Sequence, residues 1–99
     1  MARSKKDKEY LDNLTSLGCV VCFRLTGLVT PAEVHHIRTG QGTSTRASDR
    51  EAIPLCPRHH RNGGYGEAYH AGSKIWQQNF GTEIELLEYT TNRYKEIYG

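Results

Sequence analysis

Apolar residues recur at helical spacing in the first part of the chain. Between Ser4 and Leu17, the side chains of Tyr10, Leu14 and Leu17 fall on one face of a helix because they are four and three residues apart. Gly18 follows, and glycine suits the left-handed backbone conformation that often ends a helix. The pattern therefore predicts an amphipathic helix that ends just before Gly18.

The middle of the chain carries two short apolar runs that are typical of strands. Residues 32–38 have Val34 and Ile37 near their centre, with imperfect alternation, and residues 52–55 are apolar throughout. The polar, glycine-containing segment 39–49 between them predicts a loop. These features indicate two strands joined by an irregular connection.

Helical signals return after the second strand. Pro57 suits the first turn of a short helix that should end at Gly63-Gly64. We expect two more helices at 73–80 and 82–98, the second opened by the capping-box spacing of Thr82 and Glu85. The last helix has an apolar stripe, which we expect to pack against the first helix and residues 76–80, with a partner-binding face as the alternative. The stripe consists of Ile84, Leu87, Tyr94 and Ile97.

The composition limits how such a chain can be stabilised. It has 99 residues, of which 36% are hydrophobic and one is tryptophan. A chain of this length forms one small domain, and domains of this size often need a metal ion or disulfides for stability. A metal ion or a disulfide is therefore expected to cross-link this fold.

Cysteine and histidine occur in two tight pairs. Cys19 and Cys22 are separated by two residues, and so are Cys56 and His59. This arrangement supplies the four ligands of a structural Zn²⁺ site. A thioredoxin-like redox role for Cys19 and Cys22 is the alternative, but it leaves the second pair unexplained.

Several features predict a cytoplasmic protein without a membrane segment. The cysteine count is odd, the polar start is not followed by a signal-peptide core, and no apolar run reaches membrane-spanning length.

The net charge is only +2, but residues 34–61 carry five arginines against two acidic residues. Their planar guanidinium groups suit phosphate, although surface arginines can also simply be solvated. These arginines are Arg38, Arg46, Arg50, Arg58 and Arg61.

Three segments resemble the HNH (ββα-metal) endonucleases, and more closely the phage recombination-enhancement, RecA-dependent nucleases. They are His-His-Ile-Arg-Thr-Gly at 35–40, Ile-Pro-Leu-Cys-x-x-His-His-Arg at 53–61 and His-Ala-Gly at 70–72. The resemblance spans roughly residues 19–87 and implies a small α+β domain. In it a zinc-stapled ββα-metal core (19–70) lies between an N-terminal helix (1–18) and C-terminal helices (71–99).

The resemblance also implies a metal-dependent DNA endonuclease with two metal sites. Zinc would be held by the two cysteine-containing pairs, and a catalytic Mg²⁺ or Mn²⁺ by His35 and His60, with His70 as a third ligand, a phosphate contact or a surface residue. By the same resemblance His36 takes the place of the general base, and this agrees with the rule that neighbours on a strand point to opposite faces. Asp49 or a backbone carbonyl would orient His36.

The family further implies action in a bacterial or phage-infected cell, with a RecA-type recombinase filament as a partner. The family's lysine-rich N-terminal region is represented here by Arg3, Lys5, Lys6 and Lys8. A non-catalytic zinc module that binds nucleic acid or protein is the alternative, and a degenerate nuclease is a third possibility. Neither of these readings assigns a catalytic function to the histidines outside the zinc site.

Overall fold

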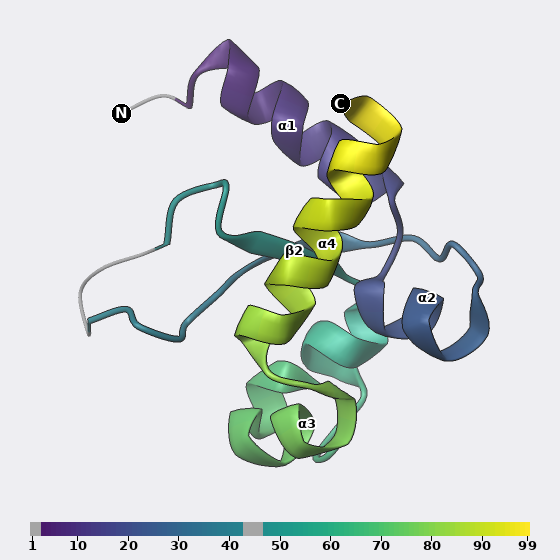
Figure 1. Ribbon diagram of the computed structural model, residues 1–99. Coiled ribbons are helices and arrows are strands. Elements are labelled where there is room, and N and C mark those ends of the chain that lie inside the picture. The colour runs from purple at the N-terminus through teal and green to yellow at the C-terminus, as the bar shows by residue number, and fades with distance from the viewer. Residues whose placement is uncertain (1–2, 43–46) are drawn as a thin grey trace.

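The computed structural model describes residues 3–42 and 47–99 (Figure 1), so Arg46 lies outside the described residues. A two-stranded sheet is surrounded by helices, which confirms the predicted α+β class. In chain order the elements are α1 (Lys5–Ser16), α2 (Val20–Thr26), β1 (Glu33–His36), β2 (Ala52–Leu55), η1 (Arg58–Asn62), η2 (Tyr69–Ala71), α3 (Ser73–Phe80) and α4 (Glu83–Tyr98). The elements η1 and η2 are single π-helical and 3₁₀ turns.

Helix α1 begins and ends at the residues that the pattern indicated. The Ser4 hydroxyl accepts a hydrogen bond from the Asp7 amide at 3.1 Å, which caps the first turn. At the other end Gly18 has a φ of +82°. A Cβ on Gly18 would lie 2.9 Å from the backbone nitrogen of Thr30. Glycine is therefore required both for the left-handed turn and for the close approach of the chain.

Helix α2 was not predicted from the sequence. It begins directly after Cys19, whose Sγ accepts a hydrogen bond from the Cys22 amide at 3.5 Å. The β-branched Val20 and Val21 have no particular preference for helix, but both are 2% exposed. Burial of these valines in the core therefore decides the conformation of the first cysteine pair.

The two strands pair antiparallel, with His35 opposite Ile53 and His36 opposite Ala52. Because successive side chains alternate between faces, the sheet separates the two histidines. Ile53 belongs to the larger core, formed with α2, α3 and α4, and His35 lies on the same face. Ala52 packs against α1, and His36 lies on that side of the sheet. His35 and His36 thus lie in different surroundings, as the strand assignment predicted.

The apolar stripe predicted for α4 is wrong at both ends. Ile84 and Ile97 are 42% and 55% exposed, whereas Leu86 and Glu83 are fully buried. The buried face runs through positions 83, 86 and 90, so the helix is rotated from the predicted orientation. The error arose because hydropathy counts Glu83 as polar, although its carboxylate is buried with hydrogen-bond partners of its own.

The expected packing partners of α4 are confirmed. Its C-terminal half lies beside α1, where the rings of Tyr94 and Tyr10 are 4.6 Å apart, and its N-terminal half contributes Leu86 to the core that contains Trp76. In Figure 1, α4 crosses the sheet between α1 at one end and α3 at the other. Within residues 3–42 and 47–99, no helix has the length and apolar character needed to cross a membrane.

Candidate metal and catalytic centre

The two cysteine-containing pairs meet in space and could hold a metal ion. Cys19 and Cys22 come from the start of α2, and Cys56 and His59 from the junction of β2 and η1. The Cys22 and Cys56 sulfurs are 3.8 Å apart, and His59 Nδ1 lies 3.2 to 3.7 Å from the three sulfurs. In a tetrahedral zinc site with Zn–S of about 2.3 Å and Zn–N of about 2.0 Å, these separations would be about 3.8 and 3.5 Å. The donor set therefore fits Zn²⁺.

Burial favours the uncharged forms of two of these four side chains, the Cys19 thiol and the His59 imidazole. Burial raises the pKa of the Cys19 thiol to about 12. Burial also lowers the pKa of His59, which favours the neutral imidazole that a metal requires. Binding of a metal ion at neutral pH must therefore displace the thiol proton of Cys19, which couples ion binding to pH.

A second group of possible ligands is formed by His35 of β1, His60 of η1 and His70 of η2. The Nε2 atoms of His60 and His70 are 3.1 Å apart, and the ring of His35 lies 5.1 and 5.5 Å from their rings. Two nitrogens bound to one ion at about 2.1 Å would be roughly 3.0–3.4 Å apart. The same spacing suits a hydrogen bond between the two imidazoles, so the groups that surround the three histidines distinguish a ligand site from a simple contact.

A buried carboxylate lies behind His35. The Nε2 atom of His35 is 2.7 Å from Oε2 of Glu83. The Glu83 carboxylate also accepts hydrogen bonds from the amides of Arg38 and Thr39 and from the Thr39 hydroxyl. Burial alone would raise the pKa of Glu83, but the hydrogen bonds from His35, Thr39 and Arg38 lower it to about 2. An ionised carboxylate only accepts, so the proton of His35 is on Nε2 and Nδ1 keeps its lone pair.

His60 has the same kind of support from a different carboxylate. Its Nδ1 is 2.6 Å from Oε1 of Glu33, and the hydrogen bond from Arg61, followed by that from His60, lowers the pKa of Glu33. This leaves His60 Nε2 directed toward His70. Burial lowers the pKa of both His60 and His70, so neutral imidazoles are favoured. Carboxylates behind histidine ligands are a recurrent feature of metal sites, and two of these three histidines have one.

On the other face of the sheet, His36 contacts Asp49 as the sequence suggested. The distance from His36 Nε2 to Asp49 Oδ1 is 2.8 Å. Asp49 also accepts two hydrogen bonds from the guanidinium of Arg3. The hydrogen bonds from Arg3 and then His36 lower the pKa of Asp49 to about 2. His36 therefore donates from Nε2 and retains Nδ1 as its basic nitrogen.

The arginines that were expected to contact phosphate differ in whether a carboxylate already pairs with them. Arg58 pairs with Glu67 at 2.8 Å, and Arg61 pairs with Glu33. Arg50 lies 3.6 Å from Asp7 and over the ring of Tyr10, next to α1. Arg38 differs, because its guanidinium has no carboxylate partner among residues 3–42 and 47–99 and lines a cavity shared with His70.

Sequence reasoning missed four residues that shape these sites: Glu33, Glu83, Tyr69 and Arg3. Tyr69 packs on His35 with ring centroids 4.4 Å apart, and burial, then Glu83, raises its pKa to about 12. For Glu33 a local signal existed, since it precedes His35 by two positions on a strand and must share its face. Glu83 and Arg3 are 48 and 46 residues from their partners, and no local pattern indicates those contacts.

Two comparisons with known proteins bear on this chain. The sequence model of the family described as "Recombination enhancement, RecA-dependent nuclease" matches residues 4–95. The match includes both groups of possible metal ligands and the contact of His36 with Asp49. Among curated proteins, no sequence matches this chain.

Proposed function

This chain belongs to the recombination-enhancement, RecA-dependent nucleases, and from that membership we propose that it hydrolyses DNA phosphodiester bonds with an HNH-type site. The membership agrees with the resemblance carried by the three histidine-containing motifs. The observation that carries the proposal is the convergence of His35, His60 and His70 on one face of the sheet, with a carboxylate-paired histidine, His36, next in the strand on the other face.

The two ligand groups have different tasks in this proposal. Cys19, Cys22, Cys56 and His59 hold a structural Zn²⁺, because four ligands close the coordination shell. His35, His60 and His70 hold a divalent ion at the reacting phosphate. When bound, this ion supplies positive charge that stabilises the phosphate in the transition state and the departing 3′ oxygen. The nitrogen donors favour Mn²⁺ over Mg²⁺, which prefers oxygen ligands.

His36 acts as the general base. Its Nδ1 takes a proton from the water whose oxygen bonds to phosphorus, while the bond from phosphorus to the 3′ oxygen breaks. Asp49 fixes the tautomer and orientation of His36 through Nε2, and Arg3 holds Asp49 in place. In this proposal the cleaved phosphate lies past the end of β1, of which His36 is the last residue, so that groups from both faces of the sheet act on it.

Dependence on a RecA filament is part of the proposal, since the family is described as RecA-dependent. Lys5, Lys6 and Lys8 are exposed on α1, and a basic helix can face DNA or the acidic groups of a partner. We therefore propose that cleavage requires DNA on which a RecA filament has assembled.

The test is cleavage of supercoiled plasmid with and without a RecA filament, in Mn²⁺, Mg²⁺ or no divalent ion. We expect His36→Ala to lower the cleavage rate about 10²–10⁴-fold, the usual contribution of a general base. Its zinc content, circular dichroism and DNA affinity should equal those of the unsubstituted protein. Cleavage by His36→Ala at the parental rate would place the base elsewhere. Absence of any cleavage by the parental protein with RecA and Mn²⁺ would favour a non-catalytic zinc module.

A further inference from the structure

A cavity of about 380 Å³ opens beside the histidine group. Its lining residues are Arg38, Tyr69, His70, Ala71, Gly72 and Ser73. His70 belongs both to this cavity and to the three-histidine group, so a molecule in the cavity lies next to any ion held there. The mechanism proposed above does not use this cavity.

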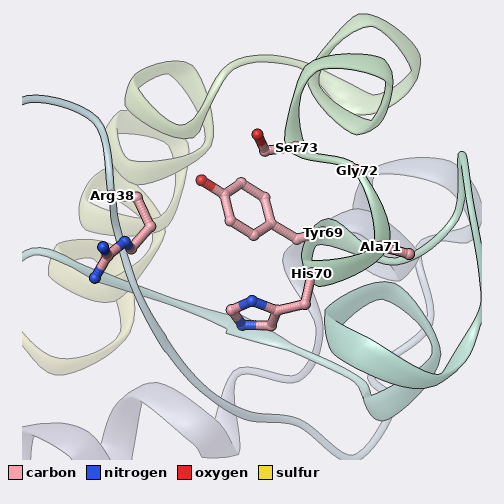
Figure 2. Close-up of a pocket in the computed structure, with 6 residues that line it drawn as sticks. All are labelled: Arg38, Tyr69, His70, Ala71, Gly72 and Ser73. Atoms are coloured by element: carbon pink, nitrogen blue, oxygen red, sulfur yellow. The ribbon is translucent and has the colours of Figure 1, made fainter. Parts of the chain in front are cut away.

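The polar groups of the cavity converge on one side of it. Figure 2 shows Arg38 to one side of the Tyr69 ring, with the Ser73 hydroxyl near the hydroxyl end of Tyr69 and His70 below. Tyr69 is buried, and its contact with His35 holds the ring in place. Ser73 is the first residue of α3 and is exposed. The lining therefore offers one cation and two hydroxyl donors.

The backbone of Arg38 is fixed by hydrogen bonds to Glu83, whereas its guanidinium has no acidic partner within residues 3–42 and 47–99. Its amide donates to both carboxylate oxygens of Glu83 at 3.0 and 3.1 Å. The guanidinium has no acidic partner in the described part of the chain, unlike those of Arg50, Arg58 and Arg61. A guanidinium carries five donors and no acceptor, and its planar fork pairs bidentately with phosphate oxygens.

We propose that this cavity binds a DNA phosphodiester adjacent to the one that is cleaved. A phosphodiester suits a lining whose one charged group is an unpaired guanidinium, and successive phosphates along a strand are the anions that a metal-bound DNA strand would present to a neighbouring cation. Arg38 is then the principal contact, with the exposed Ser73 hydroxyl as a second donor. This inference rests on the proposed function, because it takes the strand at the histidine group to be DNA.

The first experiment measures binding without cleavage. In the His36→Ala background, Arg38→Gln is compared with Arg24→Gln, an exposed arginine on α2 that lies over Tyr89 and outside the cavity. We expect Arg38→Gln to weaken DNA affinity about tenfold, typical of one lost charge-assisted contact. The slope of log affinity against log salt should fall by about 0.7–0.9. Arg24→Gln should change neither value, and equal effects of the two substitutions would overturn the proposal.

The second experiment locates the phosphate with oligonucleotides that carry one uncharged methylphosphonate at successive positions. For the protein with Arg38, one position next to the cleaved bond should weaken binding about as much as Arg38→Gln does. Arg38→Gln should be insensitive at that position and remain sensitive elsewhere. If both proteins respond alike at every position, Arg38 does not contact the flanking phosphate. Ser73→Ala should give a smaller loss at the same position.

The two proposals fail in different ways. The binding measurements need no cleavage, so they test the cavity even if the parental protein proves inactive. If the parental protein cuts DNA and Arg38→Gln binds and cuts like Arg24→Gln, the cavity assignment is wrong and the nuclease assignment stands. Measured zinc content should be the same for both arginine variants, since neither side chain contacts a ligand of that site.

Discussion

At the scale of single residues, the tautomers of three histidines follow from three carboxylates. Glu83 directs the proton of His35 to Nε2, Glu33 directs that of His60 to Nδ1, and Asp49 directs that of His36 to Nε2. In each case the nitrogen that remains can bind a metal or accept a proton. The proposed division of the histidines into ligands and base therefore depends as much on these acids as on the histidines themselves.

Glu83→Gln tests this dependence. The neutral amide cannot serve as the ionised acceptor for His35 and for the amides of Arg38 and Thr39 together. We expect affinity for Mn²⁺ at the histidine group to fall about 10–100-fold, while zinc content stays unchanged. Calorimetric titration with Mn²⁺ measures the loss, with Glu88→Gln on the exposed side of α4 as the control. Unchanged Mn²⁺ affinity would mean that Glu83 has only a packing role.

At the scale of elements, α4 shows how a hydropathy stripe can point the wrong way. The predicted face contained Ile84, but the buried face contains Leu86 and the carboxylate of Glu83. The ends of the helix were predicted well, because the Thr82 and Glu85 side chains each bond the other's backbone amide at 3.1 Å. End signals are local hydrogen bonds, whereas the buried face depends on what the helix packs against.

The orientation of α4 predicts unequal effects of two alanine substitutions. Leu86→Ala should lower the free energy of unfolding by about 2–5 kcal/mol, because it leaves a cavity beside Trp76 in the larger core. Ile84→Ala should change it by less than about 1 kcal/mol, because that side chain is 42% exposed. Urea denaturation of both variants measures the difference. Equal losses would argue against this orientation of the helix.

At the scale of the whole molecule, the cysteine-containing group joins parts of the chain that are far apart. It connects the start of α2 to the junction of β2 and η1, and both lie against the larger core. A structural zinc site contributes about 10–16 kcal/mol in small zinc domains, which is as large as most of the net stability of a typical protein, about 5–15 kcal/mol. The fold should therefore not persist without the zinc ion that we propose for this group.

Removal of zinc should unfold the protein. Elemental analysis should find about one tightly bound zinc per chain, and a strong chelator should abolish the cooperative thermal transition seen by circular dichroism. Cys56→Ala should have the same effect, whereas His36→Ala should keep both zinc and the transition, since it is not a ligand of this group. A folded preparation free of zinc would contradict the structural role.

The sequence by itself determined the features that depend on a few neighbouring residues. These include the ends of α1 and α4, the spacing of the Cys and His pairs, and the placement of His35 and His36 on opposite faces of one strand. Such features follow from local hydrogen bonds and side-chain periodicity, which act over about four residues.

The tertiary structure alone decided which distant groups meet. The contacts of Glu83 with His35 and of Arg3 with Asp49, the formation of α2, and the availability of Arg38 all depend on packing between separate elements. Many polar partners are equally plausible in the sequence. Burial selects among them, because a charge removed from water is tolerated only where hydrogen-bond donors already surround it.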